Sequence, residues 1–365
     1  MRRRKDRRAA VLFWREGMGF ATLSGGATSL SGDNHLTTTE NLRVRDRLCS
    51  VFSRTNNEDP GGSANWWKRL LVIEVAEPWV KEIIDSKAFP HAVSATVARA
   101  SQMGASTRLQ AVRKDKEYSV LGHSHVMLFT RADGLAAGYS KLHYLVPTEN
   151  VSDVVEALLI RPDDLAKFVK YQERNSGSRD LFVCTHGSHD TCCATNGIPI
   201  FDALRTNYTR KAGGDLRVWQ VSHLGGHRLS PNVLDMPDGR YWSRVEMGFL
   251  DSLVLHTGSA AAAGRYYRGW AAMPSPWEQI AEREIMVREG WSWFGRPVAS
   301  KVTWLSDDKR LAHVRVDFTD AKGANPGAFE AAVAMTGTVP TFTCLGMAPT
   351  GTANQYAVSR VTKIG

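Results

Sequence analysis

The sequence predicts an α/β protein with two successive α/β units of similar size, followed by a small α+β extension. Apolar runs of strand length alternate with helix-length segments through most of the chain, and this alternation occurs twice. After a proline-rich turn near residue 275, the pattern changes to one helix and several strands of alternating polarity. With 365 residues, 43 % of them hydrophobic, the chain can build two or three cores.

The first 38 residues are expected to form a basic, flexible tail. Residues 1–8 contain six basic residues and one acidic residue, so they carry most of the formal net charge of +9. Because the rest is only mildly basic, composition indicates no specific nucleic-acid partner. The apolar run over residues 9–14 is shorter than the ~7–15 residues of a secretory signal core. No stretch reaches the ~20 apolar residues of a membrane span.

Residues 39–149 are expected to form the first α/β domain, which supplies no cluster ligands. The predicted elements are a helix over 39–50, a strand over 68–75, a helix over 91–103, and strands over 107–112, 124–130 and 138–146. His123 and His125 share one face of a predicted strand, since alternate strand residues point the same way. Two histidines alone rarely make a site, so we interpret them as structural polar residues.

Residues 150–272 are expected to form the second α/β domain. Its predicted elements are helices over 151–160 and 163–175, a strand over 179–183, a helix opened by Pro199, a strand over 216–222 and a hairpin around Asp238–Gly239. Residues 273–365 form the α+β extension, with one helix over 277–290 and strands over 298–305, 311–319 and 354–364.

The five cysteines are unevenly distributed. Cys184, Cys192 and Cys193 fall between a predicted strand and a predicted helix, whereas Cys49 and Cys344 lie far away and are interpreted as structural. An odd, sparse set is a poor disulfide framework and fits a reducing compartment, so we expect a cytoplasmic location. The start of a helix stabilises thiolates and anionic groups bound to them.

A second segment, His223-Leu-Gly-Gly-His227, places two imidazoles on either side of a glycine pair. Glycines allow the backbone to turn tightly, so both rings can converge on one point. Two thiolates and two imidazoles make a complete four-ligand set for tetrahedral zinc or for an iron–sulfur centre. The sequence therefore predicts a metal centre, of either kind, in this part of the chain.

The segments CTHGSHDTCC (184–193) and VSHLGGHRLSPNVLDMPDGRYWSRV (221–245) resemble the sucrase/ferredoxin-like family, over most of residues 45–275. The resemblance implies that the second domain is a thioredoxin-like ferredoxin. In fungal relatives this pattern implies a 2Fe–2S cluster held by two cysteines and two histidines. Carried over position by position, the ligands are Cys184, Cys193, His223 and His227, with Cys192 as a packing neighbour.

We expect His186 and His189 to form hydrogen bonds or to face solvent. For Arg228 two readings stay open: it balances the charge of the cluster, or it is a solvated surface residue.

The expected function is one-electron transfer or redox sensing, as an electron carrier rather than an enzyme in its own right. No dinucleotide or flavin fingerprint is present, so electrons must come from a separate redox partner protein or reductase. Two alternatives remain. One is a structural or regulatory zinc protein with the same four ligands. The other is a thioredoxin-like thiol oxidoreductase that uses Cys184 or the Cys192/Cys193 pair, for which the Cys-x-x-Cys spacing is missing.

Overall fold

The computed structural model describes residues 48–364, apart from 105, 175–176, 210–214 and 345–347. All of these residues fall in one unit of the chain, Leu42–Gly365. The expected basic tail over 1–38, and the predicted helix over 39–50 up to residue 47, lie outside the described residues. The first described helix is α1 (Cys49–Thr55).

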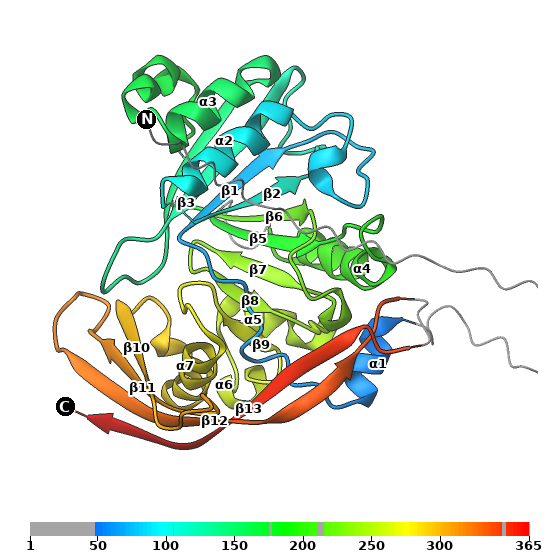
Figure 1. Ribbon diagram of the computed structural model, residues 1–365. Helices are drawn as coiled ribbons and strands as arrows, with labels where there is room; N and C mark the ends of the chain where they lie inside the picture. Colours follow the sequence, from blue (N-terminus) through cyan, green and yellow to red (C-terminus); the bar gives the residue numbers. More distant parts are fainter. Residues whose placement is uncertain (1–47, 105, 175–176, 210–214, 345–347, 365) are drawn as a thin grey trace, which may run out of the picture. The chain divides into compact units, whose positions relative to one another are not determined.

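A nine-stranded mixed sheet runs through the described chain, in the order β4-β3-β1-β2-β6-β5-β7-β8-β9 (Figure 1). Its strands are β1 (Arg69–Glu74), β2 (Thr107–Val112), β3 (His123–Thr130), β4 (Ser140–Pro147), β5 (Arg179–Cys184), β6 (Leu216–Val221), β7 (Val233–Met236), β8 (Arg240–Trp242) and β9 (Tyr267–Trp270). The predicted strands and the hairpin around Asp238–Gly239 are confirmed to within one or two residues.

The sheet consists of two halves with the same topology. In the first half β1 pairs with β2 in parallel and with β3 antiparallel, and β3 pairs with β4 antiparallel. In the second half β5, β6, β7 and β8 repeat these pairings in the same chain order. Helix α2 (His91–Gln102) joins the first parallel pair, and α4 (Thr191–Asn207) joins the second. The halves meet antiparallel where Val112 of β2 pairs with Val221 of β6.

Strand β1 is buried on both faces, which explains its continuous apolar run. Leu71 and Ile73 belong to a core shared with α2 and α3 (Val151–Leu159), whereas Leu70 and Val72 belong to the core on the other face. A strand covered on both faces needs no alternation of polar residues. Figure 1 shows α2 and α3 together on one side of this half of the sheet.

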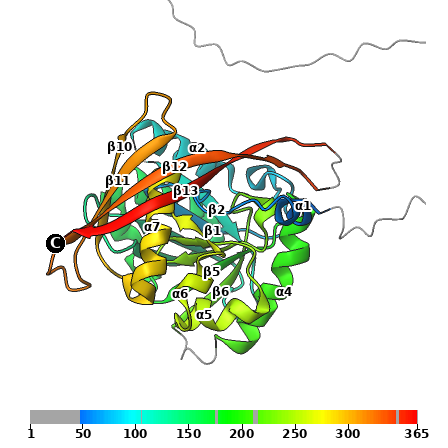
Figure 2. The ribbon, with the colours of Figure 1, turned by 90° about the horizontal axis from the view of Figure 1, so that it is seen from below.

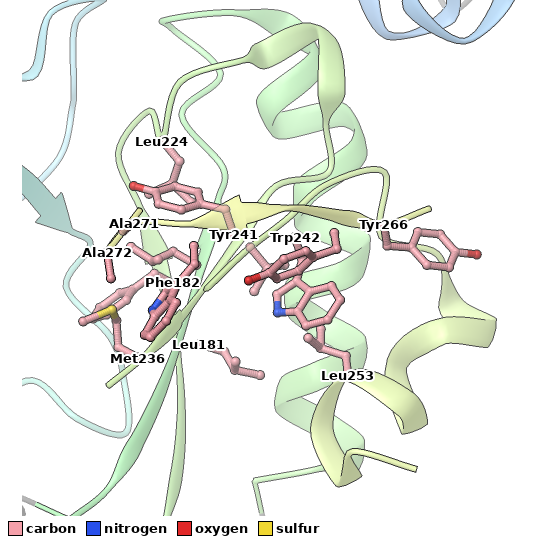
Figure 3. Close-up of a cluster of buried hydrophobic side chains, with 14 of the residues drawn as sticks. Leu181, Phe182, Leu224, Met236, Tyr241, Trp242, Leu253, Tyr266, Ala271 and Ala272 are labelled. Carbon is pink, nitrogen blue, oxygen red and sulfur yellow. The ribbon is translucent and has the colours of Figure 1, made fainter. Parts of the chain in front are cut away.

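The larger core joins the second half of the sheet to the C-terminal extension. Tyr241 and Trp242 of β8 lie fully buried in it, beside Leu181 and Phe182 of β5 (Figure 3). The short helices α5 (Leu250–Leu255) and α6 (Ala260–Ala263) and the longer α7 (Pro276–Glu289) add further buried side chains. The extension therefore shares its core with the large sheet.

The extension contains a four-stranded antiparallel sheet, in the order β10-β11-β12-β13. Its strands are β10 (Val298–Trp304), β11 (Leu311–Phe318), β12 (Gly327–Thr341) and β13 (Gly351–Ile364). The long β12–β13 hairpin reaches α1 in both views, and Phe342 stacks on Phe52 of α1 (Figures 1 and 2). Strand β12 was missed from the sequence, because its frequent Ala and Gly residues carry little strand signal.

Two predicted helices differ from the structure. The helix predicted to open at Pro199 begins at Thr191, because the Asp190 side chain accepts a hydrogen bond from the Cys192 amide and caps it, so Pro199 lies inside α4. The helix predicted over 163–175 is a 3-10 helix, Pro162–Tyr171. Pro162 lies at the start of its helix, but that helix is of the 3-10 type. Pro199 lies in a helix, but not at its start.

A buried charged network ties β4 to both central strands of the second half. Asp180 of β5 accepts hydrogen bonds from Lys141, Arg217 and Trp219, the last two at 2.9 Å from its Oδ1 atom. The side chains of Lys141 and Asp180 have no exposed surface. Removing one member of such a pair leaves the other charge buried without compensation.

Asp180→Ala is therefore expected to lower the free energy of unfolding by about 3–5 kcal/mol, measured by urea denaturation. The matched control is Asp317→Ala, since Asp317 pairs with Arg315 and both side chains are 45 % exposed. An exposed pair is worth less than about 1 kcal/mol. Equal losses in both variants would contradict the importance assigned to the Asp180 network.

Candidate metal centre

Strand β5 and helix α4 deliver three cysteines to one end of the large sheet. Cys184 is the last residue of β5 and pairs with Val221 at the end of β6. Asp190 caps α4, and Cys192 and Cys193 lie in its first turn. All three cysteines are fully buried.

The start of α4 can approach β5 because residue 197 is glycine. A Cβ atom at Gly197 would lie 2.1 Å from the carbonyl oxygen of Cys184, which is far inside van der Waals contact. Any side chain there would push the helix away from the strand end. The close approach therefore sets the spacing between Cys184 and Cys193.

The loop between His223 and His227 is held in place by two side chains from other segments. Gly225 and Gly226 have φ angles of 83° and 65°, which favour glycine. Asn65 donates to the Leu224 carbonyl at 2.8 Å, and Arg268 donates to the Gly225 carbonyl at 2.8 Å. A Cβ atom at Gly226 would lie 2.9 Å from the Arg268 guanidinium. The conformation of the loop backbone therefore fixes the positions of both histidines.

Cys184, Cys193 and His223 form the first ligand group, because their candidate ligand atoms all lie within 4.8 Å of one another. The Cys193 Sγ atom is 3.5 Å from His223 Nδ1. The hydrogen bond from Cys193 lowers the pKa of the Cys184 thiol well below its usual value, and the same contact raises the pKa of Cys193. A thiolate on Cys184 beside an imidazole is a soft, metal-binding environment.

His227 stands beside this group rather than inside it. Its ring centroid lies 5.9 Å from that of His223. Its Nδ1 atom is 3.2 Å from Asp190 Oδ2 and 3.0 Å from Cys49 Sγ. Burial lowers the pKa of His227, which favours the neutral imidazole that metals bind.

Cys49, Cys192, Cys344 and Asp190 form a second ligand group, again with all candidate ligand atoms within 4.8 Å. Sequence reasoning missed this group. Cys49 and Cys344 were interpreted as structural and Cys192 as a packing neighbour, and no local spacing links three residues so far apart in the chain. Only the placement of α1 and of the β12–β13 hairpin next to α4 brings them together.

The other histidines near the first group take hydrogen-bonding roles, as expected. His186 Nε2 lies 2.9 Å from the Val80 carbonyl, and its Nδ1 accepts from the His223 amide at 3.3 Å. The His189 ring stacks on the His223 ring with centroids 3.7 Å apart, and its Nδ1 lies 3.0 Å from the Lys81 carbonyl. Both rings thus support the position of His223.

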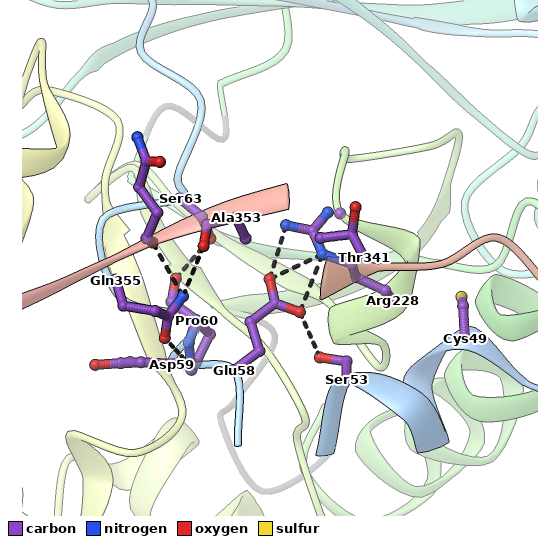
Figure 4. A network of polar contacts seen from close by, with 12 residues as sticks. Cys49, Ser53, Glu58, Asp59, Pro60, Ser63, Arg228, Thr341, Ala353 and Gln355 are labelled. Atoms are coloured by element: carbon purple, nitrogen blue, oxygen red, sulfur yellow. Dashed lines mark hydrogen bonds and ion pairs between the residues drawn. The ribbon is translucent and has the colours of Figure 1, made fainter. Parts of the chain in front are cut away.

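The structure excludes a solvated surface position for Arg228, whereas its role in balancing the charge of a cluster stays a prediction. Its guanidinium forms an ion pair with the buried carboxylate of Glu58, with Nη2 2.7 Å from Oε1, and Ser53 of α1 donates to the same carboxylate (Figure 4). Arg228 therefore fastens the histidine loop to the segment after α1. His125, interpreted as structural, is buried with its Nδ1 2.9 Å from His143 Nε2, and His123 Nδ1 lies 3.2 Å from the Leu121 carbonyl.

Fold and site together define a mixed α/β protein with a Cys/His group able to bind metal. The family model described as sucrase/ferredoxin-like matches residues 60–269, so the chain belongs to the sucrase/ferredoxin-like family. No curated protein and no solved structure matches the chain. Over the part of the chain that the structure describes, no helix is both long and apolar enough to cross a membrane.

Gly197→Ala is expected to lower the free energy of unfolding by about 3 kcal/mol, because α4 must move away from Cys184. Urea denaturation followed by circular dichroism measures the effect. The control is Gly248→Ala, since a methyl group at exposed Gly248 meets no atom within 4 Å, and it should change stability by less than about 0.5 kcal/mol. An unchanged free energy of unfolding in Gly197→Ala would show that the contact between α4 and Cys184 does not require glycine.

Proposed function

We propose that this protein is an iron–sulfur electron carrier, with a 2Fe–2S cluster held by Cys184, Cys193, His223 and His227. When bound, such a cluster accepts and returns one electron at a time. The observation that carries the proposal is the convergence of Cys184, Cys193 and His223 beside the C-terminal ends of the central strands β5 and β6. Thiolate and imidazole are the ligands that iron–sulfur centres use.

The place of His227 favours a two-iron cluster over a single tetrahedral ion. One ion, with bonds of about 2.0–2.3 Å, needs all four ligand atoms close to one point. His227 lies outside the compact group, with its ring 5.9 Å from that of His223. A cluster of two irons distributes its ligands over a longer distance. The contact between His227 Nδ1 and Asp190 also fits, because a metal-bound histidine usually pairs its other nitrogen with a carboxylate or carbonyl.

The repeated topology supports the expected thioredoxin-like fold of the second domain. A parallel strand pair joined by a helix, with an antiparallel hairpin added beside its first strand, gives the order β6-β5-β7-β8. We propose that residues 150–272 form this thioredoxin-like ferredoxin domain. On the same basis residues 39–149 are a related domain without cluster ligands, and residues 273–365 are an extension.

The electron donor is proposed to be a separate protein. A surface hollow opens beside His223, and its lining includes Lys81, Arg108 and His189. A redox partner that docks there comes close to the ligand group without any rearrangement of the sheet. All five cysteines are free thiols, which supports the proposed cytoplasmic location.

Iron and acid-labile sulfide analysis of protein purified without oxygen tests the proposal. We expect about two irons and two sulfides per chain, visible absorption, and loss of both elements in Cys193→Ser, because a thiolate ligand is removed. The matched control is His91→Gln, at an exposed position at the start of α2. A colourless protein whose bound zinc disappears in Cys193→Ser would contradict the iron–sulfur assignment.

The ligand set also predicts the reduction potential. Two thiolates and two neutral imidazoles leave an oxidised 2Fe–2S centre without net charge, so it accepts an electron more easily than a four-thiolate centre. The midpoint potential should therefore lie well above the roughly −400 mV of plant-type ferredoxins. His223→Cys should retain a cluster and lower its potential, as measured by redox titration of the visible spectrum. A potential that does not change in this variant would rule out His223 as a ligand.

A further inference from the structure

Three cysteines from distant parts of the chain meet beside the proposed cluster. Cys49 opens α1, Cys192 lies in the first turn of α4, and Cys344 follows β12. The Sγ–Sγ distances are 3.3 Å for Cys49–Cys192, 3.0 Å for Cys192–Cys344 and 3.4 Å for Cys49–Cys344. The three sulfur atoms thus form a nearly equilateral triangle.

This triangle differs from an incipient disulfide. A disulfide brings two sulfur atoms to about 2.05 Å and leaves the third without a partner. Here no pair is singled out, and each sulfur lies near the other two. Such an arrangement fits three ligands that share one central atom.

Asp190 completes the group with an anionic oxygen. Its Oδ1 atom lies 2.9 Å from Cys344 Sγ and 3.9 Å from Cys49 Sγ. Cys49 and Cys192 have no exposed surface, and Cys344 is half-buried. Thiols are weak hydrogen-bond donors, so the three buried cysteines gain little from hydrogen bonds to one another. A divalent cation could bind all three sulfur atoms and the carboxylate at once.

The chemistry and the spacing indicate zinc. Thiolates are soft ligands that zinc prefers, and structural zinc sites are tetrahedral with three or four sulfurs. With Zn–S bonds of about 2.3 Å, tetrahedral geometry places the sulfurs about 3.8 Å apart. The observed distances of 3.0–3.4 Å are shorter by about 0.4–0.8 Å, so the ion requires an outward movement of the three side chains.

The two vicinal cysteines serve two different groups. Adjacent helical residues point in different directions, so Cys193 faces Cys184 and His223, while Cys192 faces Cys49 and Cys344. The Cys192 Sγ atom also lies 3.3 Å from Ser50 Oγ, and the Cys49 amide donates to Cys344 Sγ at 3.4 Å. The amide donor favours a thiolate on Cys344, since a hydrogen bond to the charged form stabilises it.

We propose that Cys49, Cys192, Cys344 and the Asp190 carboxylate form a structural zinc site. Its four ligands differ from those of the proposed 2Fe–2S centre, although His227 Nδ1 contacts both Cys49 Sγ and Asp190 Oδ2. On binding, the thiols release their protons to solvent and each sulfur gains a bond to zinc. The ion joins α1, the start of α4 and the end of the β12 strand, and Cys49 and Cys344 both lie outside the family-matched residues 60–269.

The first experiment measures zinc by atomic emission in the full chain and in a Cys184→Ser/Cys193→Ser double variant. We expect about one zinc per chain in both proteins, with iron present only in the first. Cys344→Ser should weaken zinc binding by more than about tenfold, because a direct ligand is lost, and should retain iron. Zinc that disappears with Cys184 and Cys193 and persists in Cys344→Ser would overturn the proposal.

A second variant tests Asp190 without removing its cap. Asn is as good an N-cap as Asp, so Asp190→Asn keeps α4 intact while it removes the carboxylate charge. Zinc affinity should fall about tenfold or more, with the circular dichroism spectrum unchanged. An unaltered affinity would exclude Asp190 as the fourth ligand.

The absorption spectrum of bound Co²⁺ shows directly whether thiolates are ligands. It therefore tests the site even where a cysteine variant folds poorly. Co²⁺ added to the metal-free full chain with the Cys184→Ser/Cys193→Ser changes should give a thiolate-to-cobalt charge-transfer band and tetrahedral d–d bands. Adding Cys344→Ser should reduce the charge-transfer intensity by about one third, or abolish binding. A spectrum without thiolate bands, or a Cys49–Cys192 disulfide found by peptide mass spectrometry of the protein as purified, would overturn the proposal. Because iron is measured separately, a missing zinc site and a missing iron–sulfur cluster give different results.

Discussion

The close approach of α4 to the end of β5 is the constraint on which the metal-binding region depends. Gly197 lets the helix touch the Cys184 carbonyl, and Asp190 fixes where the helix begins. Together they fix the position of Cys192 and Cys193, in the first turn of α4, relative to the end of β5. From one helical turn, two adjacent cysteines then diverge toward two ligand groups. A shift of the helix by one residue would put one thiol in the place of the other and leave one ligand group without its helical cysteine.

Much of the fold could be predicted from the sequence, because apolar periodicity marks strands and helices locally. The strands of both halves, α2 and the hairpin at Asp238–Gly239 followed from such patterns. The start of α4 did not, since Pro199 was a stronger signal than the cap at Asp190. The convergence of Cys184, Cys193 and His223 was also foreseeable, whereas the meeting of Cys49 with Cys344 depends on how the C-terminal hairpin packs, which no local pattern encodes.

The two ligand groups share a polar boundary. Asp190 caps α4, contacts Cys344 and pairs with His227, so one carboxylate touches the helix, the cysteine triangle and a proposed cluster ligand. Arg228 and Glu58 anchor the residue next to His227 to the segment after α1. The N-terminal and C-terminal parts of the described chain therefore do more than extend the fold, because they build the surroundings of the histidine loop.

The repeat within the large sheet places different polar groups at equivalent strand ends. Strands β1 and β5 occupy equivalent places, so their last residues, Glu74 and Cys184, correspond. In the first copy this position holds a buried carboxylate that accepts hydrogen bonds from Ser119 and from the His125 amide. The end of β1 is thus closed by polar groups of its own half, whereas the equivalent end of β5 carries a thiol of the first ligand group.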